Sequence, residues 1–265
     1  MISVFVNRVC RLSPYTVRSI DNTVPTQLEP NPKDRSRALF QKRILKVAQT
    51  YAKPVIVATE MLHTMIENSF PTKAEVSDIT NAVLDGAAAT MLSGETAAGK
   101  HPQGAVQVMR EVADTASQHM QDELDGSVSQ ATGHGIPNVM CAAISLICRS
   151  LPITKIVAVT ISGFAARSIS ATQPRQTILA VSNDAMAARS FNIFFGTTGV
   201  YVPIEFSKTS TDHIVHCLEA LWRQELIEES DLILVTSVGY PKSGNRMNLI
   251  ETHRVGDLIE TLCWQ

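Results

Sequence analysis

The sequence lacks the features that mark several large classes of protein. Its 265 residues hold no apolar run near the roughly 20 residues that a membrane-spanning helix needs. The net charge is −2, so there is no basic surplus to attract nucleic acid or an anionic membrane surface. Internal repeats and low-complexity segments are also missing. We therefore expect no nucleic-acid partner and no membrane association.

Cysteine is scarce and poorly placed for metal binding. The five cysteines are odd in number and widely spaced, without a CxxC pair or a Cys/His cluster at zinc spacing. We expect reduced thiols, a cytoplasmic location and no metal-binding residues. His213 and His216 share one face of a predicted helix, but no carboxylate accompanies them at zinc spacing, which favours a surface pair.

The composition is that of a folded protein, with 45% hydrophobic and 18% charged residues. From Ser36 onward, predicted helices alternate with predicted strands, which is typical of a mainly parallel sheet covered by helices. The polar, glycine-containing stretch 121–134 predicts a domain boundary. Residues 1–38 are irregular, and their first 20 residues hold three arginines and no acid, which leaves a weak organelle-targeting signal open.

Two stretches carry most of the information, and each predicts a strand, a sharp turn and a helix. In the first, the apolar run Pro54–Ala58 predicts a strand buried on both faces. Thr72 and Glu75 then form a capping box that starts a helix to about Leu84, and Met61 and Met65 are expected in the core. The second stretch is a strand at 88–92 followed by a helix with Pro102 in its first turn.

Beyond the boundary the alternation continues. Ser182 is expected to cap one of the helices. The predicted helices lie near 137–150, 164–171, 183–192 and 211–226, and the predicted strands near 155–160, 177–181, 200–202, 231–237 and 247–255.

These two motifs closely resemble the last two strand–helix units of the pyruvate kinase catalytic barrel, and the resemblance runs from Phe40 to about Leu258. It implies an α/β fold: a partial TIM barrel over residues 39–120, then a three-layer α/β domain with a mainly parallel sheet over residues 130–265. The family's Lys-Ile-Glu and Ala-Arg-Gly-Asp-Leu-Gly strands and its lid domain have no counterpart in this sequence.

The resemblance implies the glycolytic transfer of a phosphoryl group from phosphoenolpyruvate to ADP, giving pyruvate and ATP, with magnesium and potassium as cofactors. The family's metal-binding and phosphoryl-binding residues lie in the missing strands. We therefore expect little or no activity from this chain alone. Three interpretations stay open: a fragment or truncated gene model, a shortened paralogue used for binding, or a chain that complements another polypeptide.

By the same resemblance, Thr59, Ser93 and Glu95 match catalytic positions, and Glu60, Gly94 and Lys100 lie near the substrate and nucleotide. Glu60 stands where the family usually has Gln, and it adds a negative charge beside an anionic substrate. The stretch Gly94–His101 is also close to a phosphate-binding P-loop, but His101 replaces the Ser or Thr that would hold magnesium.

The carboxy-terminal half holds a second candidate site. The loop with Thr160, Ser162 and Gly163 matches one that binds a sugar-phosphate activator in regulated pyruvate kinases, although Phe164 and Ala165 replace the usual Arg and Ser. A second loop, with Lys242, Ser243 and Gly244, could close over it. An ordinary exposed turn is the competing interpretation. The alternative function is thus a non-catalytic module that binds a sugar phosphate or docks on subunits, as a homo-oligomer or with full-length chains.

Overall fold

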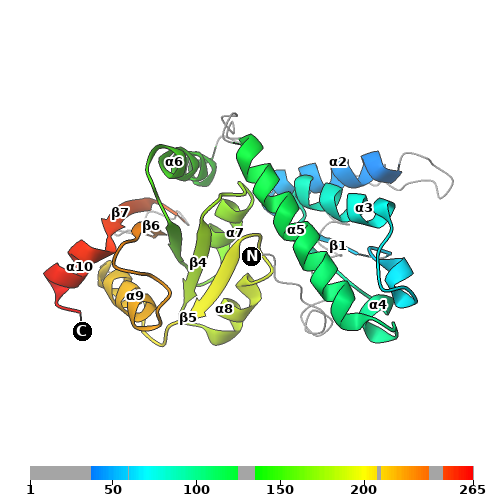
Figure 1. The fold of residues 1–265 in the computed structure, drawn as a ribbon. Coiled ribbons are helices and arrows are strands. Elements are labelled where there is room, and N and C mark those ends of the chain that lie inside the picture. Colours follow the sequence, from blue (N-terminus) through cyan, green and yellow to red (C-terminus); the bar gives the residue numbers. More distant parts are fainter. Residues whose placement is uncertain (1–36, 59, 125–134, 208–209, 239–246, 265) are drawn as a thin grey trace. The chain divides into compact units, whose positions relative to one another are not determined.

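The computed structural model describes residues 37–58, 60–124, 135–207, 210–238 and 247–264 (Figure 1). The chain divides into two compact units, Met1–Leu124 and Asp125–Gln265, called here the amino-terminal and carboxy-terminal units. Both are α/β, with sheets that are parallel or mainly parallel, as predicted. None of the described helices combines the length and apolarity that a membrane crossing requires.

The amino-terminal unit holds two strand–helix units preceded by a helix. Its strands β1 and β2 pair in parallel, with Ile56 beside Ala89 and Val57 beside Thr90. The capping box predicted at the start of α3 is present. The elements in order are α2 (Arg37–Thr50), β1 (Ile56–Val57), η3 (His63–Ile66), α3 (Lys73–Leu84), β2 (Ala89–Thr90), α4 (Gly94–Ala97) and α5 (Pro102–Leu124).

Among the described residues, helices cover one face of this small sheet. Val55 and Val57 pack into a core that includes Met61 and Met65, as expected, with apolar residues of α3 and α5. The prediction that Pro54–Ala58 is buried on both faces is wrong, because every residue of that run is partly exposed. The physical reason is that the described sheet has two strands and does not close into a barrel.

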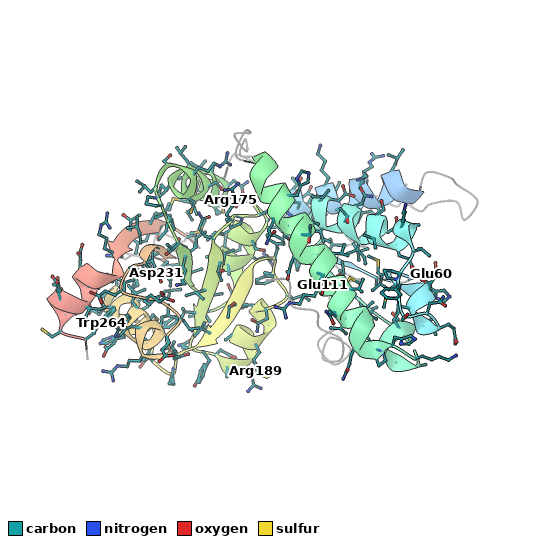
Figure 2. All side chains as sticks on the ribbon, in the orientation of Figure 1. Glu60, Glu111, Arg175, Arg189, Asp231 and Trp264 are labelled. Atoms are coloured by element: carbon teal, nitrogen blue, oxygen red, sulfur yellow. The ribbon has the colours of Figure 1, made fainter. Side chains whose placement is uncertain are left out.

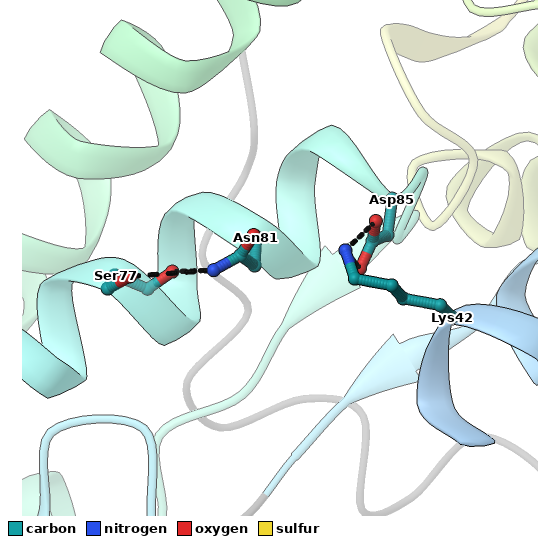
Figure 3. Close-up of polar contacts among 4 residues, drawn as sticks. All are labelled: Lys42, Ser77, Asn81 and Asp85. Atoms are coloured by element: carbon teal, nitrogen blue, oxygen red, sulfur yellow. Dashed lines mark hydrogen bonds and ion pairs between the residues drawn. The ribbon is translucent and has the colours of Figure 1, made fainter. Parts of the chain in front are cut away.

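An ion pair fastens α2 to the end of α3. Lys42 Nζ donates to both carboxylate oxygens of Asp85, at 2.5 and 2.8 Å (Figure 3). Asp85 caps the carboxyl end of α3, where a negative charge opposes the helix dipole, so the ammonium group compensates an unfavourable position. One turn earlier, Asn81 donates its side-chain amide to the carbonyl of Ser77 (Figure 3).

The carboxy-terminal unit is built on a five-stranded sheet with the order β5-β4-β3-β6-β7. The first four strands in this order run parallel, and β7 is antiparallel to β6. The elements are α6 (Ile136–Ser150), β3 (Lys155–Val159), α7 (Phe164–Ser170), β4 (Thr177–Ser182), α8 (Ala185–Phe191), β5 (Thr197–Tyr201), α9 (Asp212–Arg223), β6 (Leu232–Ser237), β7 (Leu249–Arg254) and α10 (Val255–Leu262).

Helices cover both faces of this sheet, which gives three layers (Figure 1). Along β3, Val157 and Val159 face a core built with α9 and α10, whereas Ile156 and Ala158 face a core built with α6, α7 and α8. The first of these cores also contains Trp264, and Trp222 packs against it. Parallel strands buried on both faces are what the predicted alternation requires.

At the amino ends of two strands, Lys155 forms an ion pair with the buried carboxylate of Asp231. Asp231 also accepts a hydrogen bond of 2.7 Å from the backbone amide of Glu228. Burial raises the pKa of Asp231, but the hydrogen bonds from Lys155 and Glu228 outweigh it and hold the pKa below its usual range. The pair therefore joins β3 to β6 at their start.

Two local predictions need correction. The helix expected after Ser182 is capped by Asp184, whose carboxylate accepts from the amides of Met186 and Ala187; Ser182 instead accepts from the amide of Asp184. His213 is not part of a surface pair: it is 6% exposed and stacks on Phe206 with ring centroids 5.1 Å apart. Burial lowers the pKa of His213.

The four described cysteines are free thiols. Burial raises the pKa of Cys141 and Cys217 to about 12 and that of Cys148 to about 11. These three side chains are therefore poor nucleophiles and poor metal ligands.

Gly163 and Gly196 give a matched test of the packing around α7. Both have positive φ, 72° and 61°, but a Cβ on Gly163 would lie 2.5 Å from a ring carbon of Phe191, whereas Gly196 has open space. Gly196→Ala should cost roughly 1–2 kcal/mol of unfolding free energy from the left-handed backbone alone. Gly163→Ala should cost about 1–3 kcal/mol more from overpacking. Urea unfolding measures both; equal losses would contradict the contact with Phe191.

Candidate functional site

Two loops leave the same end of the β1–β2 sheet because the strands are adjacent and parallel. In barrels of strand–helix units, the loops at the carboxyl ends of the strands form the active site. The loop after β1 carries Glu60, and the loop after β2 carries Ser93, Gly94, Glu95 and Lys100. Thr59, the first predicted catalytic residue, lies outside the described residues.

Glu95 ties these loops together. Its side chain is only 2% exposed, and its two oxygens accept from different loops: Oε1 from the amide of Leu62 at 3.1 Å, and Oε2 from the amide of Ser93 at 2.7 Å. Hydrogen bonds from amides to a carboxylate are stronger than those between neutral groups. Sequence reasoning expected a catalytic group here; the observed contacts are those of a residue that positions both loops.

Further contacts between the loops lie beside Glu95. The amide of Lys100 donates to the carbonyl of Ile66 at 2.8 Å, and a Cβ on Gly94 would lie 3.1 Å from Ile66 Cδ1. The ammonium group of Lys100 pairs with Glu67 at 2.5 Å, with both side chains about two-thirds exposed, at 67% and 65%. A pair this exposed contributes little stability, but it offsets the charge of Lys100.

Glu75 fixes the segment that follows β1. Its carboxylate accepts from the amide and hydroxyl of Thr64, at 2.7 and 2.6 Å, and from the amide and hydroxyl of Thr72, at 2.8 and 2.9 Å. Burial raises the pKa of Glu75, but these hydrogen bonds outweigh it and lower the pKa below its usual range. The sequence predicted the bond to Thr72 as part of a capping box; the bonds to Thr64 carry no local signal.

Glu60 lies at the surface of this end of the sheet (Figure 2). Its φ is 56°, in the left-handed region that costs a non-glycine residue roughly 1–2 kcal/mol. The exposed carboxylate therefore stands on a backbone conformation that the surrounding loop must hold in place.

The P-loop interpretation of Gly94–His101 does not fit the structure. The amides of Thr96 and Ala97 donate to the carbonyl of Ser93, and the amide of Ala98 donates to Gly94. A phosphate cradle needs such amides to point at the ligand, whereas these form the turn α4.

The predicted effector loop is only partly described. The amide of Thr160 donates to the carbonyl of Val181, Ser162 is exposed, and Gly163 packs under Phe191. The packing and the positive φ already explain this glycine without a phosphate. Lys242, Ser243 and Gly244 lie outside the described residues.

The described residues bring together no group of three or more His, Cys, Asp or Glu side chains that could hold a metal ion. A groove of about 500 Å³ runs along α4 and α5 but contains none of the predicted site residues; it is lined by Thr96, Pro102, Gln103, Val106, Gln107 and Arg110.

The fold and the two joined loops define a class of protein: strand–helix units of a β/α barrel followed by a three-layer α/β domain. Two family models match these parts. Pyruvate kinase, barrel domain, matches residues 33–106, and pyruvate kinase, alpha/beta domain, matches residues 138–253. The chain belongs to the pyruvate kinase family.

Similar proteins agree with this assignment. A pyruvate kinase from Corynebacterium glutamicum is 36% identical over 83% of this chain and 45% of its own length. One from Bacillus licheniformis is 33% identical over 83% of this chain and 37% of its own length. The crystal structure of a Cryptosporidium parvum pyruvate kinase has a TM-score of 0.72 at 30% identity, covering 86% of this chain and 45% of its own. The chain thus spans less than half the length of these relatives.

Replacing Glu95 tests its role between the loops. Glu95→Gln should cost about 1.5–3 kcal/mol of unfolding free energy, because an amide NH₂ then faces a buried backbone donor. The amides of Leu62 and Ser93 should exchange faster with deuterium. Glu67→Gln, at the exposed ion pair, should cost less than about 1 kcal/mol. Equal losses of unfolding free energy in Glu95→Gln and Glu67→Gln would contradict the role of Glu95 as the link between the two loops.

The lowered pKa of Glu75 predicts a pH dependence. A carboxyl group with a depressed folded pKa contributes stability above its unfolded pKa and loses it as the pH falls through the folded pKa. The unfolding free energy should therefore fall below about pH 4.5, and Glu75→Gln should flatten that fall, although Asp231 still contributes. Unfolding midpoints from pH 6 to pH 3 measure the effect, and an unchanged acid limb in Glu75→Gln would contradict it.

Proposed function

We propose that this chain provides the last two strand–helix units of a pyruvate kinase barrel together with its carboxy-terminal domain. The reaction of such a kinase is the glycolytic transfer of a phosphoryl group from phosphoenolpyruvate to ADP in the cytoplasm, which gives pyruvate and ATP. One observation carries the proposal most strongly: Glu95 joins the two loops at the carboxyl ends of β1 and β2, where a barrel of this family has its substrate.

The proposed roles follow from the match of these residues to the family's motifs. For Thr59, which lies outside the described residues, the resemblance to the family implies a hydroxyl that bonds the substrate and takes part in the proton relay that protonates the enolate after the P–O bond breaks. Ser93 lies beside that relay, and Glu95 holds its amide at 2.7 Å. Glu60, Gly94 and Lys100 lie next to the substrate and nucleotide. Because Lys100 is already paired with Glu67, its attraction for a nucleotide phosphate is weakened.

Magnesium and potassium belong to the proposed reaction, where they neutralise charge on the phosphoryl group and the substrate. The described residues of this chain offer no ligand cluster for them. Their ligands must then come from other residues, and the same holds for the cation that contacts the phosphoryl group. We therefore infer that the chain has little or no kinase activity by itself.

A coupled assay with phosphoenolpyruvate, ADP, magnesium and potassium tests this directly. The pure chain should show no turnover above a protein-free control. Turnover that Thr59→Ala abolishes would contradict the proposed inactivity and support a complete site in this chain. Turnover unaffected by Thr59→Ala would point to a contaminating enzyme, which repurification of the variant would confirm.

A second candidate function is subunit docking, and the surface of α6 favours it. Three large apolar side chains of this helix lie in solvent: Ile136, Val139 and Leu146 are 52%, 57% and 64% exposed. Their spacing of three and seven residues places them on one side of the helix, while Cys141 and Ile144 face the core. We propose this side as a contact with a second copy or a full-length subunit; sugar-phosphate binding near Ser162 is the other form of this alternative.

Paired substitutions on α6 test the docking alternative. Val139→Asp with Leu146→Asp should shift a self-associating chain to a monomer, because two charges would be buried against apolar residues. Met186→Asp, which changes another side chain that is 64% exposed, should leave association unchanged. Light scattering across protein concentration measures the mass. A monomeric parent chain, or equal association of all variants, would remove this candidate.

A further inference from the structure

A short segment between β5 and α9 contacts the rest of the carboxy-terminal unit through two apolar side chains. This segment, residues 203–207, is called here the strap. Ile204 and Phe206 pack against the apolar core that α9 and α10 share, whereas Pro203 and Glu205 are exposed. The strap is therefore held by the packing of alternate side chains.

His213, in the first turn of α9, joins the strap to the helix. Its side chain is 6% exposed, and its ring stacks on Phe206 with centroids 5.1 Å apart and an interplanar angle of 28°. The Ser207 hydroxyl accepts from the amide of Ser210 at 3.0 Å, and the Ser210 hydroxyl donates to Asp212 at 2.8 Å. The aromatic stack is thus the apolar part of a contact whose polar part lies at the start of α9.

The buried ring of His213 has no acceptor for a second proton. Its Nδ1 is buried and has no hydrogen-bond partner among the described residues. An imidazolium donates from both nitrogens, so protonation in place would bury a charge and an unpaired donor. Burial is the largest influence and lowers the pKa of His213; the backbone of Ser210 and the charge of Asp212 raise it by less, and His216 lowers it. Glu205, the charged residue of the strap, is exposed.

Opening the strap would remove this cost. In water, an imidazole takes up its proton near pH 6.5. A group whose pKa is depressed in the folded state contributes stability above its unfolded pKa and loses it as the pH falls. The closed strap should therefore be stable at neutral pH and weaken below about pH 6.5. Glu75 and Asp231, whose pKa values are also lowered, lose their charges only at more acidic pH.

We propose that His213 is a pH-sensitive latch: below about pH 6.5 its protonation breaks the stack on Phe206 and frees the strap, while the five-stranded sheet stays folded. Release exposes the Phe206 ring and the part of the core against which it packs. The contacts involved belong to the carboxy-terminal unit alone. The inference therefore goes beyond the proposed function and does not depend on it.

Nuclear magnetic resonance of the full, isotope-labelled chain tests the latch. The His213 ring should titrate at a lower pH than the ring of His216, which is exposed on the same helix. Deuterium-exchange protection of the amides of Ile204 and Ser210, corrected for the intrinsic effect of pH, should fall about tenfold or more between about pH 7.5 and pH 5. Protection along β4 should stay unchanged, because the sheet does not open.

Two variants separate the latch from a general loss of stability. His213→Phe keeps an aromatic stack on Phe206 but takes up no proton, so protection of the two amides should be equal at both pH values. His216→Gln removes an exposed histidine from the same helix and should respond to pH as the parent chain does. An equal fall in His213→Phe, or unchanged protection in the parent chain, would overturn the latch.

The ring titration of the parent chain decides the question even where His213→Phe does not fold. A pKa of the His213 ring equal to or above that of His216 would show that Phe206 accepts the imidazolium as a cation–π partner, which would overturn the latch. A lower pKa, with loss of the ring-current shift from Phe206 on protonation, would support it.

Discussion

Parallel strands impose the constraint on which most of this structure depends. They are joined by helices that cross over the sheet, and they become stable when both faces and both edges are covered. The carboxy-terminal unit meets this demand with helices on both sides of five strands. The amino-terminal unit meets it on one side of two strands. The described chain therefore combines a three-layer domain, in which helices cover both faces of the sheet, with a two-stranded sheet that helices cover on one face.

Within the amino-terminal unit, the carboxylates of Glu75 and Glu95 stabilise the segments that follow the two short strands. Glu95 accepts amides from Leu62 and Ser93 and so connects two loops, whereas Glu75 accepts amides from Thr64 and Thr72 and so holds the segment between β1 and α3. Such bonds hold a loop in one conformation without a large apolar core beneath it. A site that works by positioning reactants benefits from this rigidity, since small displacements of a reacting group are costly.

Local patterns predicted the elements well because each has a local cause. The capping box at Thr72 and the alternation along β3 depend on residues a few positions apart. The predictions that were wrong depend on contacts between residues distant in sequence. The exposure of Pro54–Ala58 reflects which strands pair with it, and the burial of His213 reflects its stacking on Phe206. The candidate site likewise has features with a local sequence signal and features that depend on distant contacts. The loops were found from their motifs, whereas the bonds of Glu95 to Leu62 and of Glu75 to Thr64 have no sequence signature.

The placement of tryptophan has a spectroscopic consequence. The chain has two tryptophans: Trp264 lies in the apolar core on one side of the five-stranded sheet, and Trp222 packs against that core. Indole emission will therefore report on the unfolding of the carboxy-terminal unit and not on the unfolding of β1 and β2. Far-ultraviolet circular dichroism reports on the helices of both units. A difference between the unfolding transitions recorded by fluorescence and by circular dichroism therefore measures how independently the amino-terminal unit unfolds.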